Sequence, residues 1–137
     1  MTRRSPTRRG IPIDRAPWWL LPAVTIAGIA VTWTGNLFGL WWLATALGVV
    51  FGLSLPRTGA AIAAAAVAGV LGWGLPLLQQ SLSLPIGRTA SVVAGIMGFG
   101  AGNGAIVVAV TLLLALLLAV TGAWVGSAVR RLAGPRA

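Results

Sequence analysis

"MGFGAGNGAIVV", residues 97–108, breaks up the uncharged and mostly apolar stretch that runs from residue 89 to residue 129. Its glycines fall at alternate positions, at residues 98, 100, 102 and 104. Glycine tolerates positive φ, so the stretch predicts a chain reversal between two helices. Asn103 is then expected to cap a helix that begins near Ala105.

The same stretch has a functional interpretation as a loop site. Exposed amides at the start of a helix attract anions, and an asparagine could help to coordinate an ion. The residues of this candidate site are Gly100, Gly102, Asn103 and Gly104. The bend and the site remain alternatives.

The composition around this stretch is that of a membrane protein. Hydrophobic residues make up 58% of the 137 residues and charged residues 8%. A soluble domain carries about 25% charged residues, because its surface must be hydrated. Several uncharged runs approach the roughly 20 residues that cross a bilayer as a helix. We therefore expect an all-α, polytopic membrane protein with one transmembrane domain, residues 17–131.

Four transmembrane helices are predicted, at residues 18–34, 37–55, 59–78 and 105–129. "TGN", residues 34–36, is expected to form the first turn. Pro76 and the polar "QQSLS" are expected to end the third helix. Residues 85–104 form an outer-face helix or a re-entrant segment in this scheme, and a fifth crossing in the alternative one.

Arginine distribution favours four crossings. The chain has ten arginines, no lysine and one acidic residue, Asp14. Short cytoplasmic loops carry the excess of positive charge. With four crossings and both termini in the cytoplasm, nine arginines lie inside and Arg88 alone lies outside. With five crossings, one of the two chain tails must lie outside, and it takes at least three arginines with it.

This threading places the chain in the cytoplasmic (inner) membrane, with an arginine-rich disordered tail at residues 1–16 and a second cytoplasmic tail at residues 132–137. The arginines stand beside apolar runs instead of forming a patch on a soluble domain, so no nucleic-acid partner is expected. They are expected to set orientation or to contact anionic lipid. The residues concerned are Arg3, Arg4, Arg8, Arg9, Arg15, Arg57, Arg130 and Arg131.

Small residues recur at a spacing of four along the predicted helices. Such pairs let helix backbones approach closely in lipid. The candidate packing residues are Gly35, Gly39, Gly48, Gly52, Ala61, Ala65, Ala68, Gly72, Gly122 and Gly126. They could pack within the chain, against a second copy, or against another membrane subunit.

The residue types that perform chemistry are almost absent. With no cysteine, no histidine, no lysine and one acid, the sequence offers no candidate catalytic, metal-binding or cofactor-binding residues. Proton-coupled carriers use ionisable groups inside the membrane, and none lies in a predicted span. We therefore expect a non-catalytic accessory or stabilising subunit of a larger membrane complex. The alternative is a small homo-oligomeric channel or transporter for an ion or a neutral solute.

Overall fold

The computed structural model describes residues 17, 19–83 and 85–133 of the chain. These residues form five helices: α1 (Leu20–Leu37), α2 (Leu43–Ser54), α3 (Thr58–Ser83), α4 (Ile86–Ile96) and α5 (Gly104–Ala133). The tail expected at residues 1–16 lies outside the described part. Of the tail expected at residues 132–137, the first two residues continue α5, and the other four lie outside the described part.

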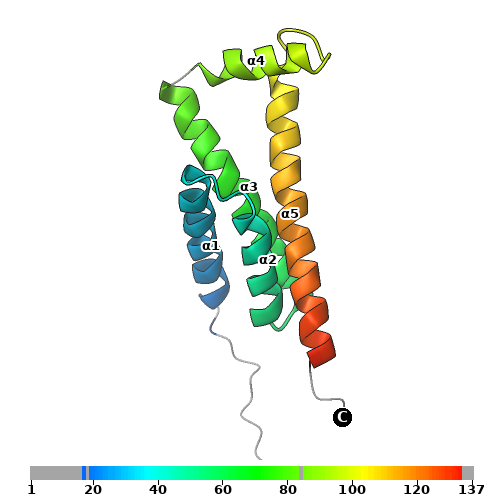
Figure 1. Ribbon diagram of the computed structural model, residues 1–137. Helices are drawn as coiled ribbons and strands as arrows, with labels where there is room; N and C mark the ends of the chain where they lie inside the picture. The colour runs from blue at the N-terminus through cyan, green and yellow to red at the C-terminus, as the bar shows by residue number, and fades with distance from the viewer. Residues whose placement is uncertain (1–16, 18, 84, 134–137) are drawn as a thin grey trace, which may run out of the picture.

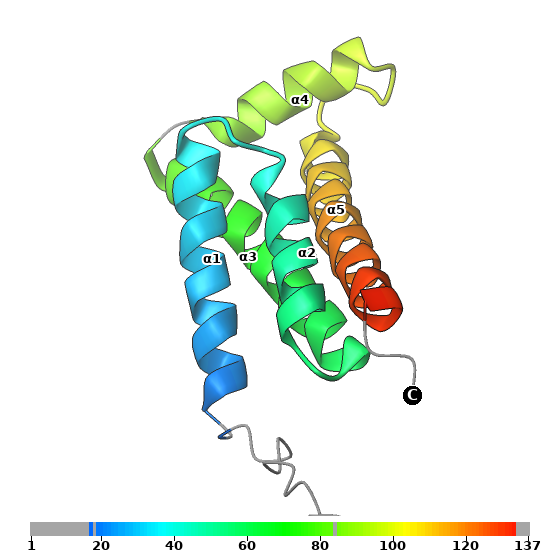
Figure 2. The ribbon, with the colours of Figure 1, turned by 60° about the horizontal axis from the view of Figure 1, so that its bottom comes forward.

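Four of the helices form a bundle, and the fifth lies across one end of it. α1 and α3 run in one direction, whereas α2 and α5 run in the other, and α4 crosses the far ends of α3 and α5 (Figures 1 and 2). The start of α1 and the end of α5 therefore lie at the same end of the bundle, opposite to α4.

Three helices are long and apolar enough to cross a membrane: α1, α3 and α5. The expected all-α class, with helices suited to a bilayer, is therefore observed. α2 has 12 residues and α4 has 11, so each extends over less than about 20 Å, compared with about 30 Å for a hydrocarbon core.

The second predicted span differs from the structure at its start. α1 continues through residues 34–36, where a turn was expected, and α2 begins only at Leu43. The chain turns at residues 38–42, where Gly39 has φ 73°. A left-handed glycine just beyond the last helical residue is a common way to end a helix.

The third predicted span also differs, because Pro76 does not end α3. The helix continues through the polar residues to Ser83, with Pro76 buried inside it. Proline removes one backbone donor, which leaves the carbonyl of Gly72 without its usual helical partner. Membrane helices tolerate this loss when neighbouring helices and local adjustments compensate for it.

The core between the helices consists largely of alanine. Its largest member is Phe51, which packs against a set of small buried residues from α3 and α5: Ala61, Ala64, Ala65, Ala68, Ala119 and Ala123. Because these side chains are short, the helix backbones lie close together over much of the bundle.

Candidate functional site

An apolar cavity of about 700 Å³ lies where α3 and α5 separate beneath α4. All three helices contribute to its wall, and so does the loop before α5. The lining residues include Gly74 and Leu78 of α3, Ile86 and Ala90 of α4, and Val108 and Ala109 of α5. The volume falls in the range of about 300–1,000 Å³ that is usual for small-molecule sites.

The two serines on the cavity wall are hydrogen-bonded to their own helices. Ser81 Oγ donates to the carbonyl of Leu78 at 2.6 Å, and Ser91 Oγ donates to the carbonyl of Gly87 at 2.7 Å. Hydroxyl groups satisfied in this way offer no side-chain donor to a ligand. The wall is therefore apolar in its chemistry as well as in most of its surface.

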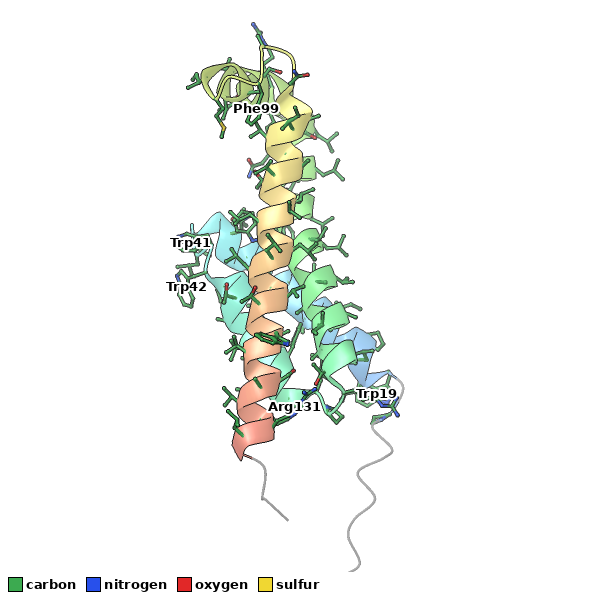
Figure 3. All side chains as sticks on the ribbon, turned by 90° about the vertical axis from the view of Figure 1, so that its right-hand side faces the viewer. Trp19, Trp41, Trp42, Phe99 and Arg131 are labelled. Carbon is green, nitrogen blue, oxygen red and sulfur yellow. The ribbon has the colours of Figure 1, made fainter. Side chains whose placement is uncertain are left out.

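The glycine-rich loop that was a candidate site connects α4 to α5 (Figure 3, near Phe99). Three of its glycines have positive φ, with values of 84° at Gly98, 87° at Gly100 and 112° at Gly102. These angles are unfavourable for residues with a Cβ, so the sequence here allows the tight reversal. Two members of the candidate site, Gly102 and Gly104, also line the cavity.

Asn103 takes a role other than the cap expected for it. Its Nδ2 donates to the carbonyl of Phe99 at 2.6 Å, within the loop. The backbone carbonyl of Asn103 accepts a bond from the amide of Ile106 at the start of α5. The side chain thus closes the loop on itself, and the main chain begins the helix.

Gly104 holds α4 against α5. A Cβ added at Gly104 would lie 2.8 Å from the amide nitrogen of Ser91 and 3.0 Å from two atoms of Ala90. Because backbone atoms are among these neighbours, a side chain at position 104 would push the two helices apart. This contact fixes α4 above the cavity.

Of the candidate packing glycines, the structure brings four together between α2 and α5. Gly48 and Gly52 of α2 lie against the backbone of α5 near Ala119 and Ala123. Gly122 and Gly126 of α5 lie in turn against the backbone of α2. The two helices are parallel here, and they pack at the distance that paired small residues allow.

The other candidate packing residues have mixed positions. Ala61, Ala65, Ala68 and Gly72 are buried in α3, with Gly72 against the side chain of Thr32 in α1. Gly35 lies against Leu43, whereas a Cβ at Gly39 would meet nothing within 4 Å. Gly39 therefore forms the α1–α2 turn, although its spacing from Gly35 resembles that of the packing pairs.

Two arginines near the end of α5 tie it to the α2–α3 connection. Arg130 Nη2 donates to the carbonyl of Pro56 at 3.1 Å, and Arg131 Nη2 donates to Thr58 Oγ1 at 2.9 Å. Arg57 stands between these two acceptors and is exposed. The other arginines proposed for orientation or lipid contact, Arg3, Arg4, Arg8, Arg9 and Arg15, lie outside the described residues.

Within residues 17, 19–83 and 85–133, no cluster of histidine, cysteine, aspartate or glutamate could hold a metal ion. Comparison of the chain with protein-family models, with curated proteins and with solved structures finds no match in any of the three.

Sequence reasoning did not identify the cavity. Most of its lining residues, among them Gly74, Ser81 and Ser91, were not singled out, because they come from three different helices whose relative positions the sequence does not give. The polar stretch "QQSLS" lies beside the cavity, but composition alone did not show that this stretch is part of a helix.

Proposed function

We propose that the chain crosses the cytoplasmic membrane with both ends on the cytoplasmic side, as a bundle of α1, α2, α3 and α5. In that membrane it serves as a non-catalytic accessory or stabilising subunit of a larger complex. The proposal has two parts, the threading and the role, and different observations support them.

The threading is supported by where the described arginines lie. Arg57, Arg130 and Arg131 are at the end of the bundle where α1 begins and α5 ends, and Arg88 is on α4 at the other end (Figure 1). Short loops with excess arginine stay in the cytoplasm. Because the α1–α2 hairpin leaves and returns to the same end of the bundle, the proposed threading keeps the start of α1 and the end of α5 on one side whether or not α2 crosses completely.

The observation that carries the proposed role is the exposed α1–α2 turn. α2 is about 18 Å long and α5 about 45 Å long. Consequently Trp41 and Trp42 project from the bundle about halfway up α5 instead of at its end (Figure 3). If α3 and α5 span the bilayer, residues 38–42 form irregular backbone at membrane depth, and such backbone needs protein or water beside it.

The side chains of this turn suit a protein partner. Phe38, Trp41 and Trp42 are 76%, 58% and 51% exposed. Large aromatic residues that are exposed together are common anchors of protein interfaces. A neighbouring subunit packed on the turn would cover both the aromatic rings and the irregular backbone.

Purification from native membranes in a mild detergent, followed by native mass spectrometry, tests the role. We expect a discrete complex with at least one other protein, and we expect Trp41→Ala/Trp42→Ala to weaken it at least tenfold. Trp124→Ala is the matched control, because Trp124 is also an exposed tryptophan, on α5 and away from the turn. Recovery of the wild-type chain as a lone monomer would contradict the proposal.

The alternative, a homo-oligomeric channel, has less support from the geometry. A pathway for ions or polar solutes needs free polar groups along its wall. The 700 Å³ cavity beneath α4 has two serines as its polar side chains, and both are bonded to helix carbonyls. Solute flux through liposomes that contain the purified chain alone would favour the channel over the accessory role.

A further inference from the structure

We infer that the cavity beneath α4 is a lipid-binding site, which holds one hydrocarbon chain of an anionic phospholipid. The inference rests on the membrane placement proposed above, and it does not depend on the proposed protein partner. The cavity beneath α4 has no part in the proposed accessory role.

The apolar gap has more room than the main cavity alone. A second cavity of about 460 Å³ adjoins the first and shares four lining residues with it: Leu77, Ile86, Ala90 and Val108. α4 lies across the gap between the ends of α3 and α5 (Figure 1). An elongated, flexible ligand such as an alkyl chain suits this shape better than a compact solute.

The wall chemistry selects hydrocarbon. The lining of the first cavity consists of glycines and aliphatic side chains apart from Ser81 and Ser91, whose hydroxyl groups donate to helix carbonyls at 2.6 and 2.7 Å. The second cavity adds Gln80, Thr89 and Thr111, and the hydroxyl groups of both threonines also donate to backbone carbonyls. A polar ligand in the first cavity would lose its bonds to water without gaining side-chain donors in return. A hydrocarbon chain loses nothing of this kind and gains dispersion contacts with the wall.

The gap does not close on itself, because α4 is fixed relative to both α3 and α5. Gly104 of α5 packs against the backbone of Ala90 and Ser91 in the middle of α4, and α4 begins at Ile86, only three residues after α3 ends at Ser83. An unfilled apolar gap of this size would forgo the contacts that close packing provides. In a bilayer, the material at hand to fill it is an acyl chain.

The head group is inferred from charge. Arg88 is exposed on α4, one residue after Gly87 of the cavity wall. Across residues 17, 19–83 and 85–133 there is no aspartate or glutamate to neutralise it. A helix that lies across the end of the bundle is suited to the head-group region, where arginine can pair with a lipid phosphate. An anionic phospholipid therefore fits both the cavity and its rim.

The test uses the full chain, purified in a neutral detergent and incubated with phosphatidylglycerol or phosphatidylcholine. Native mass spectrometry then measures how much lipid each chain retains. We expect the wild type to retain one phosphatidylglycerol molecule, and Ala109→Phe, which places a ring in the cavity, to lower the occupancy at least tenfold. Ala128→Phe is the matched control, since Ala128 is an exposed alanine of α5 that does not line the cavity, and it should retain lipid as the wild type does.

Two further variants separate the parts of the inference. Gly74→Leu fills the cavity from α3, where an added Cβ would meet only Leu112 Cδ2, at 3.6 Å, and it should reduce retention as Ala109→Phe does. Arg88→Gln should weaken phosphatidylglycerol binding about fivefold and leave phosphatidylcholine binding unchanged. Circular dichroism of each variant shows that the helices have formed.

Three results would overturn the inference. They are equal lipid retention by wild type and both cavity-filling variants, equal loss of lipid in Ala128→Phe, and a bound mass that is a second copy of the chain. The proposed accessory role is judged separately, because a partner that still co-purifies with Ala109→Phe supports that role whatever the lipid result.

Discussion

Gly122 of α5 lies directly against the backbone carbonyl of Thr45 in α2. One turn further along both helices, Gly126 lies in the same way against the carbonyl of Val49. A methyl group at either glycine would overlap main-chain atoms, which cannot swing aside as a flexible side chain can. In lipid, where the hydrophobic effect does not drive helices together, such close backbone contact is a principal source of attraction.

Gly122→Ala should therefore destabilise the bundle. Overpacking a close contact costs about 1–3 kcal/mol, and here the added methyl group can be accommodated only by separating α2 from α5. The measurement is thermal or denaturant-induced unfolding of the purified chain in a mild detergent, followed by circular dichroism.

Gly74→Ala provides the comparison for this variant. It makes the same chemical change in a helix, but the nearest atom to the new Cβ is Leu112 Cδ2, at 3.6 Å, which is ordinary van der Waals contact. Helix propensity alone should make it neutral or stabilising by up to about 1 kcal/mol. Equal destabilisation by both variants would show that the α2–α5 contact is not as close as the structure has it.

The sequence indicated which small residues could pack but not how they pair. Gly48 with Gly52 and Gly122 with Gly126 have the same spacing as Gly35 with Gly39. Only the relative positions of α2 and α5 decide that the first two pairs meet, while Gly39 lies in a turn. Spacing along one helix carries no information about its neighbour, so the pairing requires the tertiary structure.

Thr32→Val should stabilise the protein. Thr32 is 2% exposed and packs against Gly72, and its Oγ1 has no hydrogen-bond partner among the described residues. Valine keeps the shape and removes a buried, unsatisfied hydroxyl group, whose cost is about 1–3 kcal/mol in proteins. Unfolding in detergent should show a gain of about 1 kcal/mol.

Thr111→Val serves as the control for this gain, since Thr111 Oγ1 already donates to the carbonyl of Val107 at 2.8 Å. Its replacement removes a satisfied group, and little change is expected. A loss of stability in Thr32→Val would mean that its hydroxyl group has a partner, such as its own helix backbone, in the membrane.

Helix positions were easier to predict than helix ends. The long apolar run after Asn103 and the arginines at residues 130–131 located α5 to within a few residues. By contrast, Pro76 and the polar residues after it indicated an end to α3 that does not occur. Proline disfavours a helix locally, but the buried position of Pro76 shows that packing against neighbours outweighs that preference.

Gly100→Ala should loosen the connection between α4 and α5. Gly100 has φ 87°, and holding an alanine in a left-handed conformation costs about 1–2 kcal/mol. If this strain makes α4 open away from α5 more often, the amides of α4 should exchange their hydrogens roughly 5- to 30-fold faster than in the wild type. Gly95→Ala is the matched control, because Gly95 is helical and an added Cβ there would come no closer than 3.8 Å to its neighbours. Equal exchange in the two variants would argue against a strained loop.

The depth of the α1–α2 turn can be measured directly, because the chain has no cysteine. Single-cysteine variants Phe38→Cys and Ala101→Cys place a spin label on the turn and on the α4–α5 loop, both at exposed positions. In reconstituted bilayers we expect the label at residue 38 to be relaxed by oxygen, which concentrates in hydrocarbon. The label at residue 101 should be relaxed instead by a water-soluble nickel complex.

The expected difference between the two labels has a geometric reason: α2 is about 18 Å long, and about 30 Å is needed to reach the far surface of the bilayer. Equal access of the nickel complex to both labels would place the turn at the membrane surface, so the α1–α2 hairpin would cross completely and the irregular backbone at residues 38–42 would no longer require a protein neighbour.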